Sequence, residues 1–184
     1  MPLPVAHGLV GAAIVAATRD DFSFRKDWGP MVMGATLAVV PDLDLYLSWV
    51  LGYGLRMHGT FSHSIFFALA IGSIASLLMR EDSVKCVLGY FGAALSHGLL
   101  DTATKKDFGG SALLWPLSDQ RFRLGIIKDY EFYPDPNTQT IGEMLAHTAE
   151  FCYYELWIYL PIFVLVVFVK SYQSRRQLRM GRNY

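Results

Sequence analysis

Residues 151–169 read FCYYELWIYLPIFVLVVFV, an apolar run whose one charged residue is Glu155. A helix needs roughly 17–25 mostly apolar residues to cross the hydrocarbon core of a bilayer, and this run is long enough. The whole chain has the same character, because 53% of its 184 residues are hydrophobic, 17% are charged, and the mean hydropathy is +0.30. Such a composition excludes a disordered chain and predicts a membrane protein.

Four further apolar segments precede this run. They span residues 5–18, 30–51, 63–79 and 86–100. All are long, rich in Ala, Leu and Gly, and without strict alternation, which favours helix over strand. We therefore predict an all-α polytopic membrane protein of about five helices, with residues 5–18 and 86–100 short enough to be buried or re-entrant. Residues 1–184 are expected to form one domain, with a long external loop at 101–150 and a basic tail at 170–184.

The basic residues are unevenly divided between the two sides of this five-helix topology. The side that carries the tail has ten Lys and Arg residues and the other side has six. Under the positive-inside rule the tail is predicted to be cytoplasmic, and the N-terminus and the long loop external. The formal net charge is zero, so no nucleic-acid partner is expected, whereas membrane lipid is.

Several ionisable residues lie inside or beside the apolar segments, where they cost free energy unless they are paired, hydrated or bound to metal. In the five-helix topology all of them fall on the external side or at middle depth, so they are predicted to meet in one outward-facing pocket. The candidates for metal binding are His7, Asp42, Asp44, His58, His63, His97, Asp101 and Glu155.

Local spacing supports this pocket. His97 and Asp101 are four residues apart, which places them on one helix face. Pro41 disfavours helix in the preceding residue, and an extended stretch there would put the carboxylates of Asp42 and Asp44 on one side. Ser62 is the expected N-cap of the following helix, with His63 in its first turn and His58 in a loop.

Imidazole nitrogens and carboxylate oxygens suit zinc, and also iron, nickel or manganese. The candidates outnumber the three protein ligands of one catalytic zinc, so two or more divalent ions are expected. Glu150 is the weaker alternative to Glu155. His147 is interpreted as part of a solvated helix face.

These motifs resemble those of the YdjM-like family of membrane-bound metal-dependent hydrolases over most of residues 5–125. The resemblance rests on Ala6-His7-Gly8, Pro41-Asp42-Leu43-Asp44, His58 to Ser64, Ser96 to Asp101 with Thr104, and Leu114-Trp115-Pro116. The family is distantly similar to zinc-dependent phospholipase C and P1-type nucleases, which are all-helical and hold clustered metals. One departure is Gly59, where the family often has arginine after the first histidine of this motif.

The resemblance, and not the spacing, implies hydrolysis of a phosphoester of a lipid or similar amphiphile by metal-activated water. The residues expected to carry catalysis are Asp42, Asp44, His97 and Asp101, with any unligated acid available as general base. Two alternatives use the same His/Asp cluster: a transporter of metal ions or protons, and a non-catalytic metal-stabilised membrane protein. Ligands on both sides of the membrane would favour the transporter.

Overall fold

The computed structural model describes residues 4–44, 58–103, 110–126 and 140–181 of the chain. These ranges contain five α-helices and no β-strand, so the predicted all-helical fold is confirmed for them. The helices are α1 (Pro4–Thr18), α2 (Phe24–Val39), α4 (Ile65–Met79), α5 (Val84–Ala103) and α6 (Ile141–Gly181), with the short 3-10 helices η1 (Val40–Asp42) and η3 (Phe61–His63).

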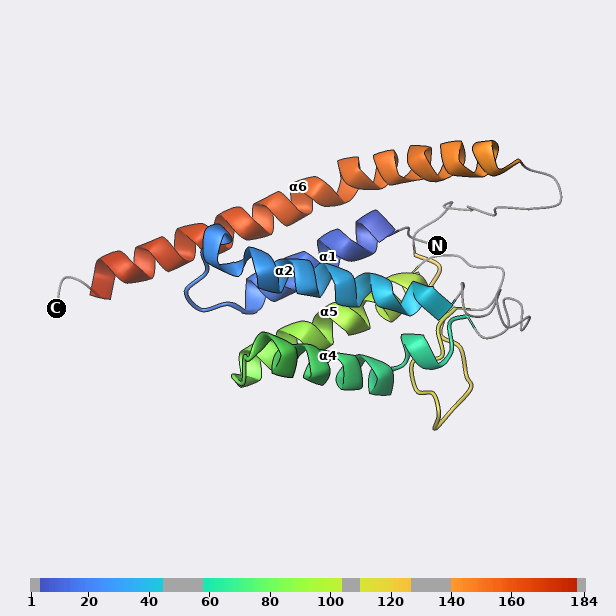
Figure 1. The fold of residues 1–184 in the computed structure, drawn as a ribbon, viewed down its shortest axis with the longest axis horizontal. Helices are drawn as coiled ribbons and strands as arrows, with labels where there is room; N and C mark the ends of the chain where they lie inside the picture. The colour runs from blue at the N-terminus through green and yellow to red at the C-terminus, as the bar shows by residue number, and fades with distance from the viewer. Residues whose placement is uncertain (1–3, 45–57, 104–109, 127–139, 182–184) are drawn as a thin grey trace.

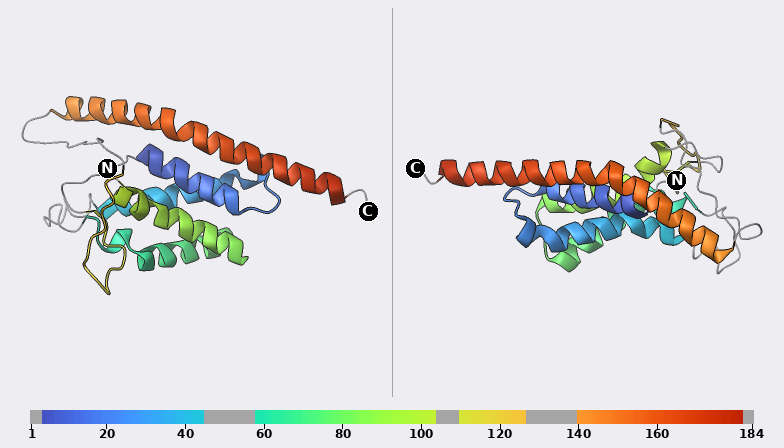
Figure 2. Two further views of the ribbon diagram at one scale, coloured as in Figure 1. Left: turned by 180° about the vertical axis from the view of Figure 1, so that it is seen from behind. Right: turned by 90° about the horizontal axis from the view of Figure 1, so that it is seen from above.

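The helices run back and forth along one axis (Figure 1). α1 lies in the middle and packs against α2, α5 and α6, whereas α4 packs on the far side of α5. Both views in Figure 2 show α6 as a long outer helix that extends beyond the other four. The start of α1, the end of α2, η3 and the end of α5 therefore meet at one end of the bundle.

Small residues allow α1 and α2 to pack closely. A Cβ atom on Gly11 would clash with the carbonyl oxygen of Gly34, so the two backbones touch at this crossing. The adjoining core contains Val15, Leu37 and Tyr90, all buried. Close approach through glycine is the usual packing mode of helices in lipid, where no hydrophobic effect drives helices together.

α6 begins at Ile141, within the stretch that was predicted to be loop up to residue 150. A capping box explains the start: the Thr140 hydroxyl accepts a hydrogen bond from Glu143 N at 3.3 Å, and the Glu143 carboxylate accepts one from Thr140 N at 2.8 Å. α5 continues to Ala103, so the predicted loop is shortened at both ends.

Among the described residues, one helical stretch is long and apolar enough to cross a bilayer, Leu145–Gln177. Few of its residues are buried in the protein, and Trp157, Leu165 and Phe168 are each more than half exposed. A contiguous apolar surface of this kind is suited to lipid. α1 and α4 are apolar but only 15 residues long, about 22 Å against a hydrocarbon core of roughly 30 Å.

Whether all five helices span, and in which direction, stays a prediction. We expect single cysteines placed at Arg175 and Arg176, near the end of α6, to react with a membrane-permeant maleimide only. A cysteine at Trp115, in the described segment 110–126, is expected to react with an impermeant reagent applied from outside, because the basic residues are concentrated on the tail side. External labelling of the tail would reverse this orientation.

The end of the bundle that carries the α1–α2 loop holds a partly buried ion pair. The Arg19 guanidinium donates to both carboxylate oxygens of Glu81 at 2.7 Å, and Nη2 also donates to the Tyr90 hydroxyl at 3.0 Å. The Tyr90 hydroxyl in turn donates to Glu81. These contacts join the end of α1 to the α4–α5 turn and to α5.

Candidate metal centre

Four elements bring histidine and aspartate side chains together at the opposite end of the bundle. His7 comes from the first turns of α1, Asp42 from η1, His63 from η3, and His97 and Asp101 from successive turns of α5. All five residues are buried. The imidazole rings of His7 and His97 and the carboxyl group of Asp101 have no exposed surface. Segments far apart in the sequence therefore converge on one small volume, as the predicted single pocket required.

The donor atoms lie within a few ångströms of one another. His97 Nε2 is 3.0 Å from His63 Nε2 and 3.4 Å from Asp42 Oδ1. Asp101 Oδ2 is 3.3 Å from His63 Nε2, and its Oδ1 is 3.7 Å from His7 Nε2. The His7 ring stacks on the His97 ring with 3.9 Å between centroids.

Within the described residues, three overlapping groups have donor atoms close enough to share a metal ion. The groups are His7, Asp42 and His97; Asp42, His58 and His63; and His63, His97 and Asp101. They share Asp42, His63 and His97, so six side chains form one cluster. An arrangement in which adjacent groups share ligands suits two or more ions better than one.

Hydrogen bonds fix where the protons of two of these histidines lie. His97 Nδ1 is 2.7 Å from the carbonyl oxygen of Ala38, which can only accept, so Nδ1 carries the hydrogen. Ser62 donates its single hydroxyl hydrogen to Asp44, so it accepts from His63 Nδ1 at 2.9 Å. In the neutral rings both Nε2 atoms then present lone pairs, and these two atoms face each other.

His58 follows the same pattern. Its Nδ1 is 2.7 Å from Asp44 Oδ1, a carboxylate oxygen that accepts, so the lone pair of the neutral ring is on Nε2. His58 Nε2 is buried and has no hydrogen-bond partner among the described residues, and neither has either ring nitrogen of His7. A buried imidazole lone pair without a partner is costly unless a hydrogen-bond donor or a cation satisfies it. The donor set therefore fits divalent metal ions.

Asp44 lies behind the ligands. It accepts hydrogen bonds from His58 Nδ1 and from Ser62, and it belongs to none of the three donor groups. A carboxylate in this place fixes the tautomer and orientation of metal-binding histidines. The expected extended stretch that would align Asp42 with Asp44 is replaced by the 3-10 turn η1, so the two carboxylates meet different partners.

The predicted N-cap of α4 is wrong by two residues. Ser64, not Ser62, caps α4, because its Oγ accepts from Phe67 N at 3.1 Å. His63 lies in η3, before the helix begins. Ser62 is thereby left to link Asp44 to His63.

Gly98 lets η3 approach the helix that carries His97. A Cβ atom on Gly98 would lie 2.6 Å from the carbonyl oxygen of His63. The irregular segment 110–126 contacts the chain just after η3, where Ile65 N, at the start of α4, donates to the Leu113 carbonyl at 2.9 Å. These backbone contacts set the distance between the Nε2 atoms of His63 and His97.

Glu155, the remaining predicted ligand, belongs to none of the three donor groups. Glu155 of α6 is buried and its Oε2 accepts a hydrogen bond from Ala6 N at 3.1 Å, beside His7. Glu150, the weaker alternative ligand, is exposed on α6, and His147 is exposed there too, as expected for a solvated face. Thr104 lies outside the described residues.

Three contributors were missed from the sequence: Ser62, the Ala38 carbonyl and Gly98. The carbonyls in the last turn of a helix lack intrahelical donors, so the end of α2 just before Pro41 was a detectable place for such an acceptor. Nothing local indicated the roles of Ser62 or Gly98, because both depend on how η3 docks on α5.

We expect Ser62→Ala to weaken metal binding without abolishing it. The substitution removes the hydroxyl that orients His63, and loss of such an outer hydrogen bond typically costs about 10–100-fold in metal affinity. Equilibrium dialysis of the detergent-purified protein against zinc measures this. Ser83→Ala, at the far end of the bundle before α5, is the control, and equal affinities in wild type and Ser62→Ala would refute the orienting role.

The fold and the cluster define a helical membrane protein with a candidate centre for divalent metal. The chain belongs to the YdjM inner membrane protein family, whose pattern matches residues 1–176. No curated protein and no solved structure matches the chain. The family match confirms the resemblance seen in the motifs and agrees with the predicted location in a membrane.

Proposed function

We propose that the protein is a metal-dependent hydrolase of phosphoesters, with zinc as the ion that its donor set suits best. The observation that supports this most directly is the convergence of lone pairs from His58, His63 and His97 with carboxylate oxygens in a buried site. We take the reaction class from the distant similarity that the sequence leads us to expect between this family and zinc-dependent phospholipase C and P1-type nucleases.

The chain's own residues have distinct tasks in this proposal. The six cluster residues hold the ions, Asp44 keeps His58 in the correct tautomer, and the Ala38 carbonyl does the same for His97. Divalent ions, when bound, supply a water of lowered pKa and neutralise charge on the phosphoryl oxygens. Burial of the cluster excludes bulk water, which strengthens these electrostatic interactions.

The proposed reaction is tested with methyl 4-nitrophenyl phosphate and the full-length protein in detergent. We expect release of 4-nitrophenol by metal-loaded protein, loss of that activity after treatment with a chelator, and recovery on addition of zinc or manganese. The His97→Ala protein serves as the control for contaminating phosphodiesterases. Absence of any metal-dependent turnover above that control would overturn the hydrolase assignment.

The described residues disfavour the transporter alternative. A transport path needs ligands along its length, whereas the candidate ligands gather at one end. At the other end the buried Arg19 is already paired with the half-buried Glu81 at 2.7 Å, and it lies 3.9 Å from the buried Asp27. Uptake of zinc into proteoliposomes that depends on His97 would favour transport instead.

A further inference from the structure

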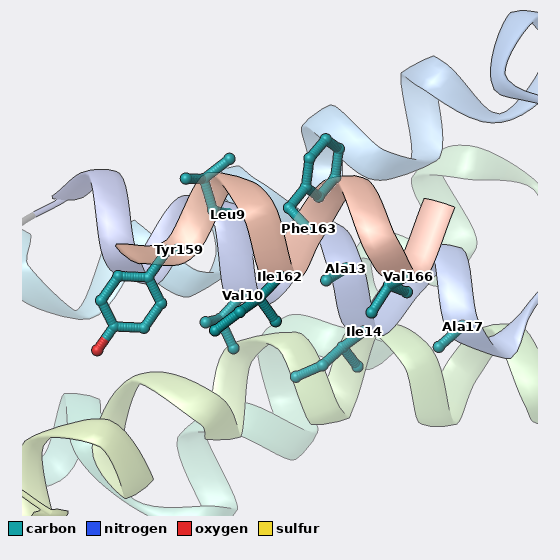
Figure 3. Close-up of a pocket in the computed structure, with 9 residues that line it drawn as sticks. All are labelled: Leu9, Val10, Ala13, Ile14, Ala17, Tyr159, Ile162, Phe163 and Val166. Carbon is teal, nitrogen blue, oxygen red and sulfur yellow. The ribbon is translucent and has the colours of Figure 1, made fainter. Parts of the chain in front are cut away.

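An apolar groove lies between α1 and α6 (Figure 3). It has a volume of about 190 Å³ and is lined by side chains between residues 9 and 17 of α1 and between residues 159 and 166 of α6. The Tyr159 hydroxyl is the one polar side-chain group among the labelled lining residues in the figure. Apolar pockets with few polar groups are typical of sites for apolar ligands.

The groove stays open because α6 packs to one side of α1. Phe163 and Val167 of α6 contact the cluster formed by Ala12, Ala16 and neighbouring buried residues. α6 makes no extensive contact with α5, which packs against another face of α1. Ile162, on the wall of the groove, is consequently 53% exposed.

The surroundings of the groove indicate what occupies it. Its α6 wall lies within Leu145–Gln177, the stretch that is long and apolar enough to cross a membrane. In an inner membrane protein this surface meets hydrocarbon and not water. An alkyl chain is therefore the ligand whose chemistry matches the lining.

One end of the groove, at Leu9 and Tyr159, lies within about one helical turn of His7 and Glu155. Glu155, Tyr159, Ile162 and Val166 follow one another at helical spacing on a single stripe of α6. The Glu155 carboxylate, one turn before Tyr159, accepts a hydrogen bond from Ala6 N, and His7 is the next residue. From there the α1 residues that line the groove, Leu9 to Ala17, extend over about 12 Å along the helix.

We propose that this groove binds the alkyl chain of an amphiphilic phosphoester whose head group lies at the metal centre. The proposal rests on the proposed function and names its substrate class: one apolar chain joined to a phosphoester. Each methylene that moves from water into such a groove favours binding, so for compounds added from water the affinity should rise with chain length.

The test compares octylphosphonate with methylphosphonate, which carry the same head group and are not hydrolysed. Binding to the zinc-loaded, full-length protein in phosphatidylcholine nanodiscs is measured by calorimetry. Ala13→Trp and Ile162→Trp fill the groove from opposite walls, and Leu165→Trp adds the same side chain on the exposed surface of α6 as a matched control. Zinc content is measured in all variants, so that damage to the metal centre is detected.

We expect wild type and Leu165→Trp to bind octylphosphonate at least about tenfold more tightly than methylphosphonate. Both groove variants should lose this preference while keeping their zinc and their affinity for methylphosphonate. The proposal is overturned by equal affinity of wild type for both compounds, by failure of both to bind, or by an octyl preference that survives both groove substitutions. Hydrolysis of methyl 4-nitrophenyl phosphate without an octyl preference would refute the groove alone, and an octyl preference without hydrolysis would refute the hydrolase alone.

Discussion

Alanine at His63, His97 or Asp101 should remove bound metal and metal-dependent turnover while leaving the yield of folded protein nearly unchanged. Each residue contributes a donor atom to at least one of the three groups, and His63 and His97 each contribute to two. Loss of a shared ligand weakens the binding of more than one ion. It therefore reduces both the supply of hydroxide and the neutralisation of charge on the phosphoryl group. Metal content by mass spectrometry, turnover and yield are measured on the same samples.

A purely structural role for these residues predicts a different pattern. Replacing an ionisable residue that is buried only for packing removes a desolvation cost, so such variants can keep or gain stability without any change in metal content. Asp42→Ala should behave as the three variants above do. His147→Ala, on the exposed face of α6, is the control and should keep its metal. Unchanged metal content in all three variants would remove the basis for the hydrolase proposal.

Arg19→Ala should destabilise the protein by about 1–3 kcal/mol, because it leaves the partly buried Glu81 carboxylate without its cation and its main hydrogen-bond donors. The side chains of Arg19 and Glu81 are 9% and 23% exposed, and the pair is bidentate. Thermal unfolding in detergent, followed by circular dichroism, measures the change. Metal content per folded chain should be unaffected, because this ion pair lies at the opposite end of the bundle from the cluster.

The Lys85–Asp20 pair provides a matched control near the same end of the bundle. Its nitrogen and oxygen are 2.5 Å apart, but both side chains are more than 60% exposed. Exposed pairs contribute little, so Lys85→Ala should shift the unfolding temperature by far less than Arg19→Ala. Equal shifts would show that burial of the Arg19 pair has no special role.

The same ion pair predicts a loss of stability in acid. Burial of Glu81 raises its pKa, but the hydrogen bonds from Arg19 and Tyr90 outweigh burial and hold the pKa below its ordinary value of 4.5. A carboxyl with a lowered pKa in the folded state stabilises the protein above its ordinary pKa, and this contribution is lost as the pH falls through the folded-state value. Unfolding of Glu81→Gln should therefore depend less on pH below about 4.5 than unfolding of wild type, and parallel pH profiles would contradict this.

The helical architecture was predictable because long apolar segments in lipid have to satisfy their backbone hydrogen bonds internally. The convergence of His7, Asp42, His63 and His97 followed from topology, since alternating helices bring every second helix end to the same side. The predicted loop up to residue 150 overlooked the start of α6, which the capping-box spacing of Thr140 and Glu143 indicates.

The local geometry at η3 could not be predicted in the same way. Ser62 and Ser64 are equally good N-caps by residue type. The choice between them depends on a contact distant in sequence, the hydrogen bond from Ile65 N to the Leu113 carbonyl. The role of Asp44 depends on that choice, because Ser62 can join Asp44 to His63 only when it is not capping α4.

The central claim, that the buried His/Asp cluster is a centre for divalent metal, is tested most directly by titrating zinc into the chelator-treated, full-length protein. We expect wild type to take up at least two equivalents and the double variant His63→Ala/His97→Ala to lose this uptake, because these residues are shared among the three donor groups. Uptake of no zinc by wild type, or of the same amount by the double variant, would contradict the account.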